Sequence, residues 1–361
     1  MGLARFRILR ASLSFMRSNQ NEDNRSKPVT IVDVAQAAGV TSMTVSRVMK
    51  GYKHVSPKTR EKVLRVAQEM KYTVNLAARA LVTGQTGIIA VISERLDNPY
   101  YANLVHHLEL QLETNGYVMR LLHTDEELDS LINSTNSSAI DGVIVAGLFH
   151  RIKEFLRTGP ERAQPCVFVN TSVHSEADFV HLDLEPALTK AIGIMVRDGR
   201  QRIAHIGMGA LEFPHPITDL EDRILTYLSE MKKLGRKIEL IGVNPSVTID
   251  SPARIEALKE YFQSNGCPDG LVCFNDAIAL HVFRALSDLG LSIPEDVMLV
   301  GCDDLPFMKF FEPPLSSIAP PIEEASALAW QFLQARMLNP AIPRQQATLD
   351  AELVLRKSLQ T

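Results

Sequence analysis

The 361-residue sequence has few of the features that mark secreted, membrane-spanning or metal-binding proteins. Its four cysteines form no Cys-x-x-Cys pair, and four unpaired thiols fit a reducing cytoplasm. No run of about 18 apolar residues occurs, so we expect no membrane span. The ten histidines are scattered and show no metal-ligand spacing, because the adjacent His106 and His107 would point to different faces of a helix. We therefore expect a cytoplasmic protein that binds neither a metal nor a membrane.

Enzyme motifs are also missing. The sequence contains no P-loop and no Gly-x-Ser-x-Gly nucleophile elbow. Gly207-Met208-Gly209 follows an apolar run, but Glu212 stands where a dinucleotide-binding fingerprint would have its third glycine. We therefore expect no cofactor, no catalytic residues and no enzymatic activity.

The most informative segment covers residues 30–49, which is typical of a helix-turn-helix. Ile31, Val34, Ala35 and Ala38 lie at i, i+3, i+4 and i+7 and predict one apolar face, and a second apolar face follows after a break at Gly39-Val40. Glycine can adopt the left-handed backbone that ends the first helix. A helical hairpin within a larger fold would show similar spacing. The neighbouring sequence therefore has to distinguish such a hairpin from a DNA-binding helix-turn-helix.

The following residues favour a DNA-binding head. Ser56-Pro57 is a helix start, and a further short helix is predicted between Asn75 and Leu81. Residues 27–84 contain ten Lys and Arg against three Asp and Glu, a balance of +7, whereas residues 85–361 contain 23 against 37, a balance of −14. A basic head on an acidic body is the charge distribution expected of a DNA-binding protein.

Residues 28–84 resemble the headpiece and hinge of the lactose/galactose repressor family. The resemblance rests on a long ordered series of motifs: Asp33-Val34-Ala35, Ala38-Gly39-Val40, Thr44-Val45-Ser46-Arg47-Val48, Val55-Ser56, Thr59-Arg60 and the run Tyr72, Asn75, Leu81. It continues more loosely over nearly all of the remaining chain. It implies a homodimeric transcription regulator, most simply a repressor, that binds a pseudo-palindromic operator in double-stranded DNA.

The resemblance also implies DNA-binding roles for individual residues. It assigns major-groove reading to Ser42, Met43, Ser46 and Arg47, and backbone or flanking contacts to Thr30, Thr41, Thr44 and His54. Lys50, where the family often has Asn, adds a phosphate contact, and hinge contacts fall on Asn75, Ala78 and Leu81. Leu81 matches the leucine that wedges into the minor groove at the operator centre. Without the resemblance, Leu81 would be an ordinary packing residue.

Beyond Gly84 the chain alternates between short apolar runs and amphipathic helices. Strands are predicted at 88–92, 118–122, 142–145, 167–169, 203–206, 271–274 and 297–300, with helices such as 104–112 and 277–289 between them. This alternation predicts an α/β fold with parallel, doubly wound sheets. About 275 residues exceed one compact core, so we expect two lobes with a ligand between the carboxyl ends of their strands.

The resemblance implies that this core is periplasmic-binding-protein-like, with two lobes joined by three crossovers near 181–185, 315–320 and 343–346. The expected domains are a basic disordered extension (1–26), a helix-turn-helix domain (27–73), a hinge helix and linker (74–86) and an effector-binding and dimerisation core (87–361). The first lobe would comprise 87–182 and 319–343, and the second would comprise 183–318 and 344–361. Residues 1–17 of the extension carry four arginines among apolar residues but no uninterrupted signal-peptide core.

The family positions give a set of effector-binding residues in the cleft, namely Tyr100, Tyr101, Asn170, Arg223, Asn275 and Asp303. An arginine fork suits vicinal hydroxyls or a carboxylate, and the tyrosines can stack on a ring. Each has a structural alternative: Arg223 as a surface ion-pair partner, Asn275 as a helix cap, and Tyr100 as a core aromatic. Together they imply a small-molecule effector, most commonly a sugar or sugar derivative in this family.

Two other functions stay open at this point. Asp183-Leu184-Glu185-Pro186 departs from the family pattern, so the core could respond to a protein partner or could have lost its effector site. An exported solute-binding protein would need a signal sequence and no DNA-binding head, and residues 28–84 argue against it. No leucine-heptad tail follows Leu359, which favours a dimer over a tetramer.

Overall fold

A computed structural model describes residues 29–49, 55–72, 85–94, 96–124, 126–127, 140–147, 164–170, 177–208, 222–243 and 252–360. The chain divides into two compact units, Met1–Val82 and Thr83–Thr361. We refer to them as the head and the core. The expected extension 1–26 lies outside the described residues.

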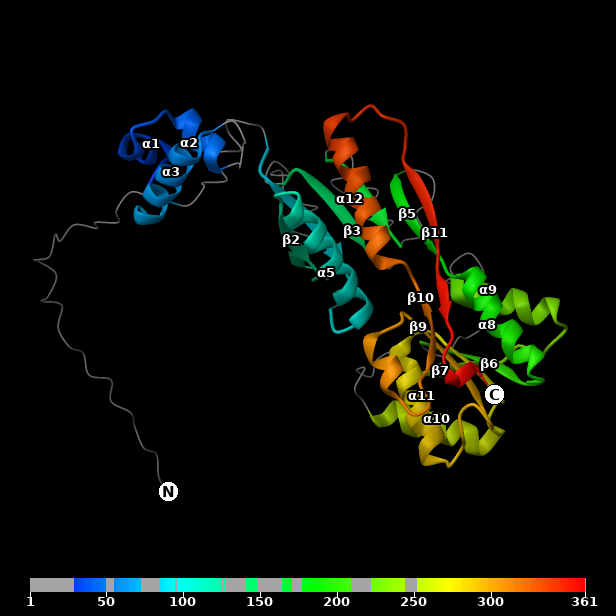
Figure 1. The fold of residues 1–361 in the computed structure, drawn as a ribbon. Coiled ribbons are helices and arrows are strands. Elements are labelled where there is room, and N and C mark those ends of the chain that lie inside the picture. Colours follow the sequence, from blue (N-terminus) through cyan, green and yellow to red (C-terminus); the bar gives the residue numbers. More distant parts are fainter. Residues whose placement is uncertain are drawn as a thin grey trace, which may run out of the picture. The chain divides into compact units, whose positions relative to one another are not determined.

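The described part of the head contains three short helices, α1 (Ile31–Ala38), α2 (Ser42–Met49) and α3 (Pro57–Glu69), coloured blue in Figure 1. Gly39 ends α1 in the left-handed conformation at φ 63°, as predicted. The small apolar core of the head is formed by Val34, Ala35, Ala38, Val45, Val48, Val63, Val66 and Ala67. The apolar face predicted for residues 31–38 is therefore the buried face of α1.

Side-chain caps fix where each of these helices begins. The Thr30 hydroxyl accepts from the Asp33 backbone N–H at 3.3 Å, and Asp33 accepts from the Thr30 backbone N–H at 2.8 Å. The Thr41 hydroxyl accepts from the Thr44 N–H at 3.2 Å, and the Ser56 hydroxyl accepts from the Thr59 N–H at 3.2 Å. The caps predicted at Thr41 and Ser56 are confirmed.

The core contains two six-stranded sheets. The first has the order β11-β5-β4-β3-β1-β2, and all its described pairings are parallel. Its strands are β1 (Ile88–Ser93), β2 (Val118–Leu122), β3 (Gly142–Ala146), β4 (Cys166–Val169), β5 (Asp178–Asp183) and β11 (Gln346–Asp350). Helices α5 (Pro99–Thr114) and α12 (Ile322–Leu338) pack together on one face.

The second sheet has the order β12-β10-β9-β8-β6-β7 and is parallel except for β12, which runs antiparallel to β10. Its strands are β6 (Ile203–Met208), β7 (Leu240–Val243), β8 (Gly270–Cys273), β9 (Met298–Cys302), β10 (Ser316–Ala319) and β12 (Glu352–Val354). The described helices are α8 (Glu185–Arg197), α9 (Asp222–Lys233), α10 (Pro252–Asn265) and α11 (Asp276–Asp288), with short 3-10 turns η4 (Pro306–Phe310) and η5 (Lys357–Leu359).

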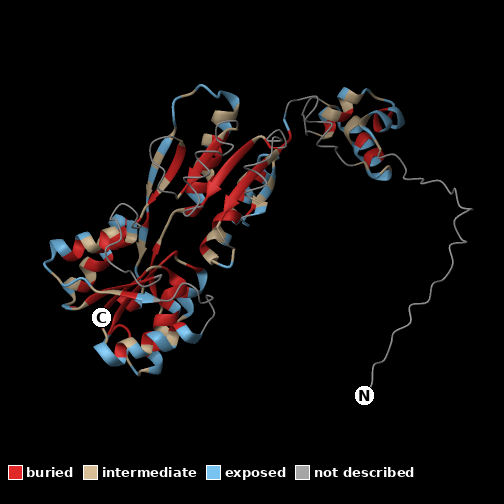
Figure 2. Cartoon of the chain, turned by 180° about the vertical axis from the view of Figure 1, so that it is seen from behind, coloured by how far each residue is buried: buried red, intermediate tan, exposed pale blue. Residues whose placement is uncertain are grey.

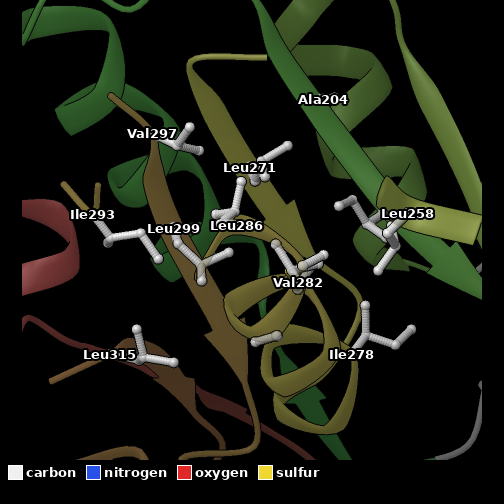
Figure 3. Close-up of a cluster of buried hydrophobic side chains, with 14 of the residues drawn as sticks. Ala204, Leu258, Leu271, Ile278, Val282, Leu286, Ile293, Val297, Leu299 and Leu315 are labelled. Atoms are coloured by element: carbon white, nitrogen blue, oxygen red, sulfur yellow. The ribbon is translucent and has the colours of Figure 1, made fainter. Parts of the chain in front are cut away.

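Helices cover both faces of the second sheet, which explains its continuous apolar strands. On one face, Ile278, Val282 and Leu286 of α11 pack against Leu271 of β8 and Leu299 of β9 (Figure 3). On the other face, α8 and α9 bury a separate cluster. The inner strands of both sheets are accordingly mostly buried, whereas the edge strands β2, β11 and β12 are partly exposed, and the helices expose their outer faces (Figure 2). The predicted doubly wound α/β fold is confirmed.

The chain passes between the sheets three times. It leaves the first sheet after Asp183, returns between Ala319 and Ile322, and crosses again at Ala351 between β11 and β12. We had expected residues 344–361 to lie together in the second lobe, but Gln346–Asp350 pairs with β5 of the first sheet. Strand β11 alternates between exposed and half-buried residues, so it lacks the apolar run by which β1–β4, β6, β8 and β9 were predicted. Strands β5, β7, β10 and β12 were not predicted either.

Within the described part of the chain, no helix is both long enough and apolar enough to cross a membrane.

Candidate DNA interface and effector site

The outer face of α2 presents the residues predicted to read bases. Met43 is 62% exposed and Arg47 is exposed, while Ser42 and Ser46 are half-buried. Val45 and Val48 on the opposite face are buried in the core of the head. Helix α2 therefore offers hydroxyls, a thioether and a guanidinium to a partner, which are groups that can contact base edges and thymine methyl groups.

The threonines predicted to contact the DNA backbone also serve as helix caps. The Thr30 hydroxyl donates to the Asp33 carboxylate at 2.7 Å, and the hydroxyls of Thr41 and Thr44 lie 3.0 Å apart. Hydrogen bonds from Thr30 hold the pKa of the exposed Asp33 carboxyl below its usual value. Thr30 and Thr41 are exposed, and Thr44 is half-buried.

Five other predicted DNA-binding residues lie outside the described residues. They are Lys50, His54, Asn75, Ala78 and Leu81.

In the core, the predicted effector residues lie near the carboxyl ends of parallel strands. Tyr100 and Tyr101 begin the helix that follows β1, and Asn170 directly follows β4. Asn275 comes two residues after β8, and Asp303 directly follows β9. This is the edge at which ligands bind in open α/β sheets.

Three of these residues form a hydrogen-bonded and aromatic group on the first sheet. The Asn170 side-chain amide donates to the Tyr100 hydroxyl at 2.7 Å. The rings of Tyr100 and Tyr101 meet edge to face, with centroids 5.1 Å apart. Asn170 adopts φ 51°, a left-handed conformation that asparagine tolerates better than most residues.

Charged residues that follow strands of the second sheet also act on Tyr100. Burial raises the pKa of its phenol well above the usual value, the negative charge of Asp303 raises that pKa further, and the positive charge of Arg223 lowers it. The structure thus brings Tyr100, Arg223 and Asp303 into one electrostatic neighbourhood, although they come from different sheets. Tyr100 is also a core aromatic, because only 6% of its surface is exposed.

Arg223, on the first turn of α9, reaches across to the end of β8. Its Nη1 donates to the Phe274 carbonyl, and its guanidinium carbon lies 4.1 Å from the centroid of the Phe274 ring. Asn275 follows, and its side-chain oxygen caps α11 by accepting from the Ile278 N–H at 2.9 Å. This cap uses the side-chain carbonyl oxygen of Asn275. The amide N–H groups of Asn275 take no part in the cap.

Asp303 belongs to a strained turn held by a buried carboxylate. Asp303 and Asp304 have φ values of 111° and 49°, which are unusual for residues other than glycine. The fully buried Asp276 accepts from the Leu305 N–H and from the Ser317 hydroxyl, both at 2.7 Å. Asp276 therefore ties this turn to β10, one of the strands next to a crossover.

Further contacts tighten the same network. The Ser317 hydroxyl accepts from the Asp304 N–H at 3.0 Å, and Arg356 donates to the Asp304 carboxylate at 2.7 Å. A Cβ added at Gly301 would lie 2.1 Å from the Asp276 carboxylate, so only glycine fits there. Burial raises the pKa of Asp276 to about 7, although its hydrogen bonds oppose the shift.

Sequence reasoning missed two residues near this site. Asp276 resembled an ordinary first-turn carboxylate, and nothing in the sequence revealed its burial. His205 stands in the apolar run that forms β6 and is 1% exposed. A histidine within such a run is itself a signal, because most buried positions there are aliphatic.

Within the described residues, no group of three or more His, Cys, Asp or Glu side chains could hold a metal ion.

Comparisons with known proteins match both units. Residues 30–75 match the model of bacterial regulatory proteins of the lacI family. Residues 193–359 match a periplasmic binding protein-like domain. The first match covers the three helices of the head, and the second covers all six strands of the second sheet together with α12 and β11.

Individual relatives extend over almost the whole chain. The ribose operon repressor of Halalkalibacterium halodurans is 26% identical over 332 residues, which cover 91% of this chain and 96% of the relative. Among solved structures, the Lac repressor dimer bound to operator and the anti-inducer ONPF aligns with a TM-score of 0.75 at 22% identity, over 93% of this chain and 100% of that one. A complex of the transcriptional regulator CelR with cellobiose aligns with a TM-score of 0.63 at 25% identity, over 91% and 99%.

Proposed function

Because the chain belongs to the LacI/GalR family of DNA-binding transcriptional regulators, we propose that it is a homodimeric repressor whose affinity for a pseudo-palindromic operator is set by a small-molecule effector. The observation that best supports this proposal is the exposed polar face of α2 on a separately packed head. The relatives are regulators rather than enzymes, and we propose no catalytic activity for this chain.

We propose that Ser42, Met43, Ser46 and Arg47 contact base edges. None of the four side chains is buried in the core of the head. This supports the role, because a side chain must be accessible to contact a base. Thr30, Thr41 and Thr44 would contact the backbone from the ends of the helices, where N–H groups also favour phosphate. Lys50, His54, Asn75, Ala78 and Leu81 are proposed to complete the interface.

We propose that the effector binds among Tyr100, Tyr101, Asn170, Arg223, Asn275 and Asp303. The set combines donors, an acidic acceptor and two aromatic rings, which suits a sugar or sugar derivative. CelR was solved with cellobiose, and another relative is a ribose operon repressor, so carbohydrate ligands occur among similar proteins. Binding would bias the two lobes between arrangements and so alter the head's affinity for DNA.

A second copy of the chain is the proposed occupant of an aromatic patch on the core. The patch contains the exposed Phe307 and Phe310 and the half-buried Phe283 and Phe311. Phe310 is 77% exposed, and the ring centroids of Phe283 and Phe311 lie 4.8 Å apart. Clustered exposed aromatics are characteristic of protein interfaces, and a twofold dimer fits a palindromic site.

Substitution of Arg47 tests the DNA-binding proposal. Arg47→Ala should weaken binding to the DNA selected by the wild-type protein by roughly 1 to 3 kcal/mol, because a good base contact is lost. Arg65→Ala on α3 is the matched control, since the Arg65 side chain is 68% exposed and should affect binding little. Fluorescence anisotropy at fixed salt measures both. Equal affinities of the Arg47→Ala and wild-type proteins would exclude a base-reading role.

A further inference from the structure

His205 occupies the middle of β6, between Leu240 of β7 and Val272 of β8. Its ring packs on Tyr227 of α9, with centroids 5.6 Å apart. Among the described residues, neither of its two buried ring nitrogens has a hydrogen-bond partner. The Tyr227 hydroxyl does not serve as one, because it donates to the Ile203 carbonyl at 2.9 Å. Buried polar atoms left without partners cost folding free energy, so such a residue calls for an explanation beyond packing.

The ring is oriented toward the effector end of the sheet. A Cβ built at Gly207 would lie 3.5 Å from both Cε1 and Nδ1 of His205. Apart from Gly207 itself and its two neighbours in the chain, no other described atom lies within 4 Å of that Cβ position. Gly207 is two residues nearer the carboxyl end of β6, and its φ is not positive, so the backbone conformation does not require glycine. Its missing side chain instead leaves space beside the Nδ1 edge of the imidazole.

Burial keeps this imidazole neutral. Burial, and to a smaller extent the positive charge of Arg223, lowers the pKa of His205 to about 3. A neutral imidazole has one N–H donor and one lone-pair acceptor. Arg223, which the proposed function places in the effector site, is therefore also a close neighbour of His205.

We propose that His205 is a specificity-determining residue of the effector site, and that its ring accommodates a hydroxyl group of a neutral polyhydroxylated effector. The inference rests on the proposed function, since it adds a contact to the same site. It accounts together for the unpartnered Nδ1, the direction of the ring and the space at Gly207. The Nδ1 edge of His205 would meet the effector beside the Arg223 guanidinium.

The chemistry of the ring selects the ligand class. A hydroxyl can donate to the imidazole lone pair or accept from the imidazole N–H, so it fits either tautomer. A carboxylate or a fully ionised phosphate can only accept, so it pairs with Nδ1 only in the tautomer that carries the proton there. Sites built around buried polar groups discriminate strongly against ligands that leave those groups unpaired.

The first test uses the full-length protein without any ligand. His205→Phe keeps an aromatic ring against Tyr227 and removes both unpartnered nitrogens, so the midpoint of thermal unfolding should rise. A clearly lowered midpoint would show that the imidazole supports the fold, and would overturn the proposal. His205→Asn, which retains a donor and an acceptor near the position of Nδ1, is the matched polar variant.

The second test measures binding by calorimetry. The probes are the neutral compounds D-ribose, D-galactose, cellobiose, lactose and mannitol, and the contrasting compounds D-ribose 5-phosphate, citrate and hypoxanthine. We expect a neutral compound to bind. The dissociation constant should rise about tenfold or more in His205→Phe, rise less in His205→Asn, and exceed the measurable range in Arg223→Ala.

The outcomes separate this inference from the function on which it rests. Binding that Arg223→Ala abolishes but His205→Phe leaves unchanged would overturn the role of His205 and leave the effector site standing. Binding of the phosphate, citrate or hypoxanthine alone would overturn the hydroxyl specificity. Binding of no probe by the wild-type protein would count against the proposed small-molecule function, and the inference would fall with it.

Discussion

At the scale of single residues, the buried Asp276 carboxylate positions residues of the proposed effector site without lining that site. Its carboxylate holds the Leu305 N–H and the Ser317 hydroxyl, and thereby fixes the strained turn at Asp303. A buried ionised carboxylate is costly unless hydrogen bonds compensate for its desolvation. Two short hydrogen bonds compensate in part, and the remaining cost appears as the raised pKa of Asp276.

This raised pKa predicts a specific dependence of stability on pH. The pKa of Asp276 rises from 3.8 to about 7 on folding, so the folded protein retains this proton while the unfolded chain releases it. The stability contributed by the protonated group is complete below about pH 4 and is lost as the pH rises toward 7. Asp276→Asn stays neutral throughout. Its free energy of unfolding, relative to that of wild type, should therefore be larger, meaning a more stable fold, at pH 8 than at pH 5 by about 2 to 3 kcal/mol.

Urea denaturation of both proteins at the two pH values measures this difference. Taking the difference between variant and wild type cancels the titration of all other groups. A difference that is the same at pH 5 and pH 8 would show that Asp276 does not titrate in this range.

Residue-level predictions from the sequence succeeded where the cause was local. Gly39 and the caps at Thr41 and Ser56 depend on neighbours within four residues, so the pattern was sufficient. Asp276 and His205 were missed because their environments come from strands and turns that are distant in the sequence. The DNA and effector roles of individual residues stay predictions.

At the scale of elements, apolar runs and periodicity predicted β1–β4, β6, β8, β9 and the helices of the head, but not β5 or β7. The prediction for β2 matched its observed bounds, Val118–Leu122. Strand β11 was not predicted, because as an edge strand it alternates between exposed and half-buried residues and carries no apolar run. Strand β11 belongs to the first sheet because the chain crosses between the sheets only after it, at Ala351. The pairing of β11 with β5 in the structure shows this.

The turn between α1 and α2 gives a prediction at this scale. Gly39→Ala forces a side chain into the left-handed region at φ 63°, and should destabilise the head by roughly 1 to 2 kcal/mol. Space is not the cause, because an added Cβ would lie 3.6 Å from the nearest atom, Lys62 Nζ. Hydrogen exchange of residues 31–49 in the full-length protein measures the loss of protection.

Gly193→Ala in α8 is the matched control, because the same substitution there falls within a helix at an ordinary φ. It should stabilise the core by roughly 0.5 to 1 kcal/mol. Unchanged protection of residues 31–49 in Gly39→Ala would show that the head tolerates the strain, and would remove Gly39 as a determinant of the turn.

At the scale of the whole molecule, the alternation of strands and helices predicted the α/β architecture, because it leaves few other arrangements. The three crossovers were implied by the family resemblance, and the third lies at Ala351 rather than near 343–346. It could not predict how the surface of the core is used. The exposed Phe310 and its neighbours became a candidate interface only when the structure placed α11 beside η4.

Assembly can be tested through this patch. Phe310→Glu should dissociate the proposed dimer into monomers, because it places a charge in an apolar interface. Leu338→Glu is the matched control, since Leu338 is 80% exposed and lies on α12, outside the patch. Sedimentation velocity at equal concentrations compares the three proteins. A Phe310→Glu protein that sediments like a wild-type dimer would place the interface elsewhere.

The most direct test of the account is selection of binding sites from random double-stranded DNA by the full-length protein, followed by measurement of how many chains bind each site. We predict enrichment of an inverted repeat that binds two chains, with the enrichment lost in Arg47→Ala. Absence of any enriched sequence, or a single asymmetric site that binds one chain, would contradict a dimeric sequence-specific regulator.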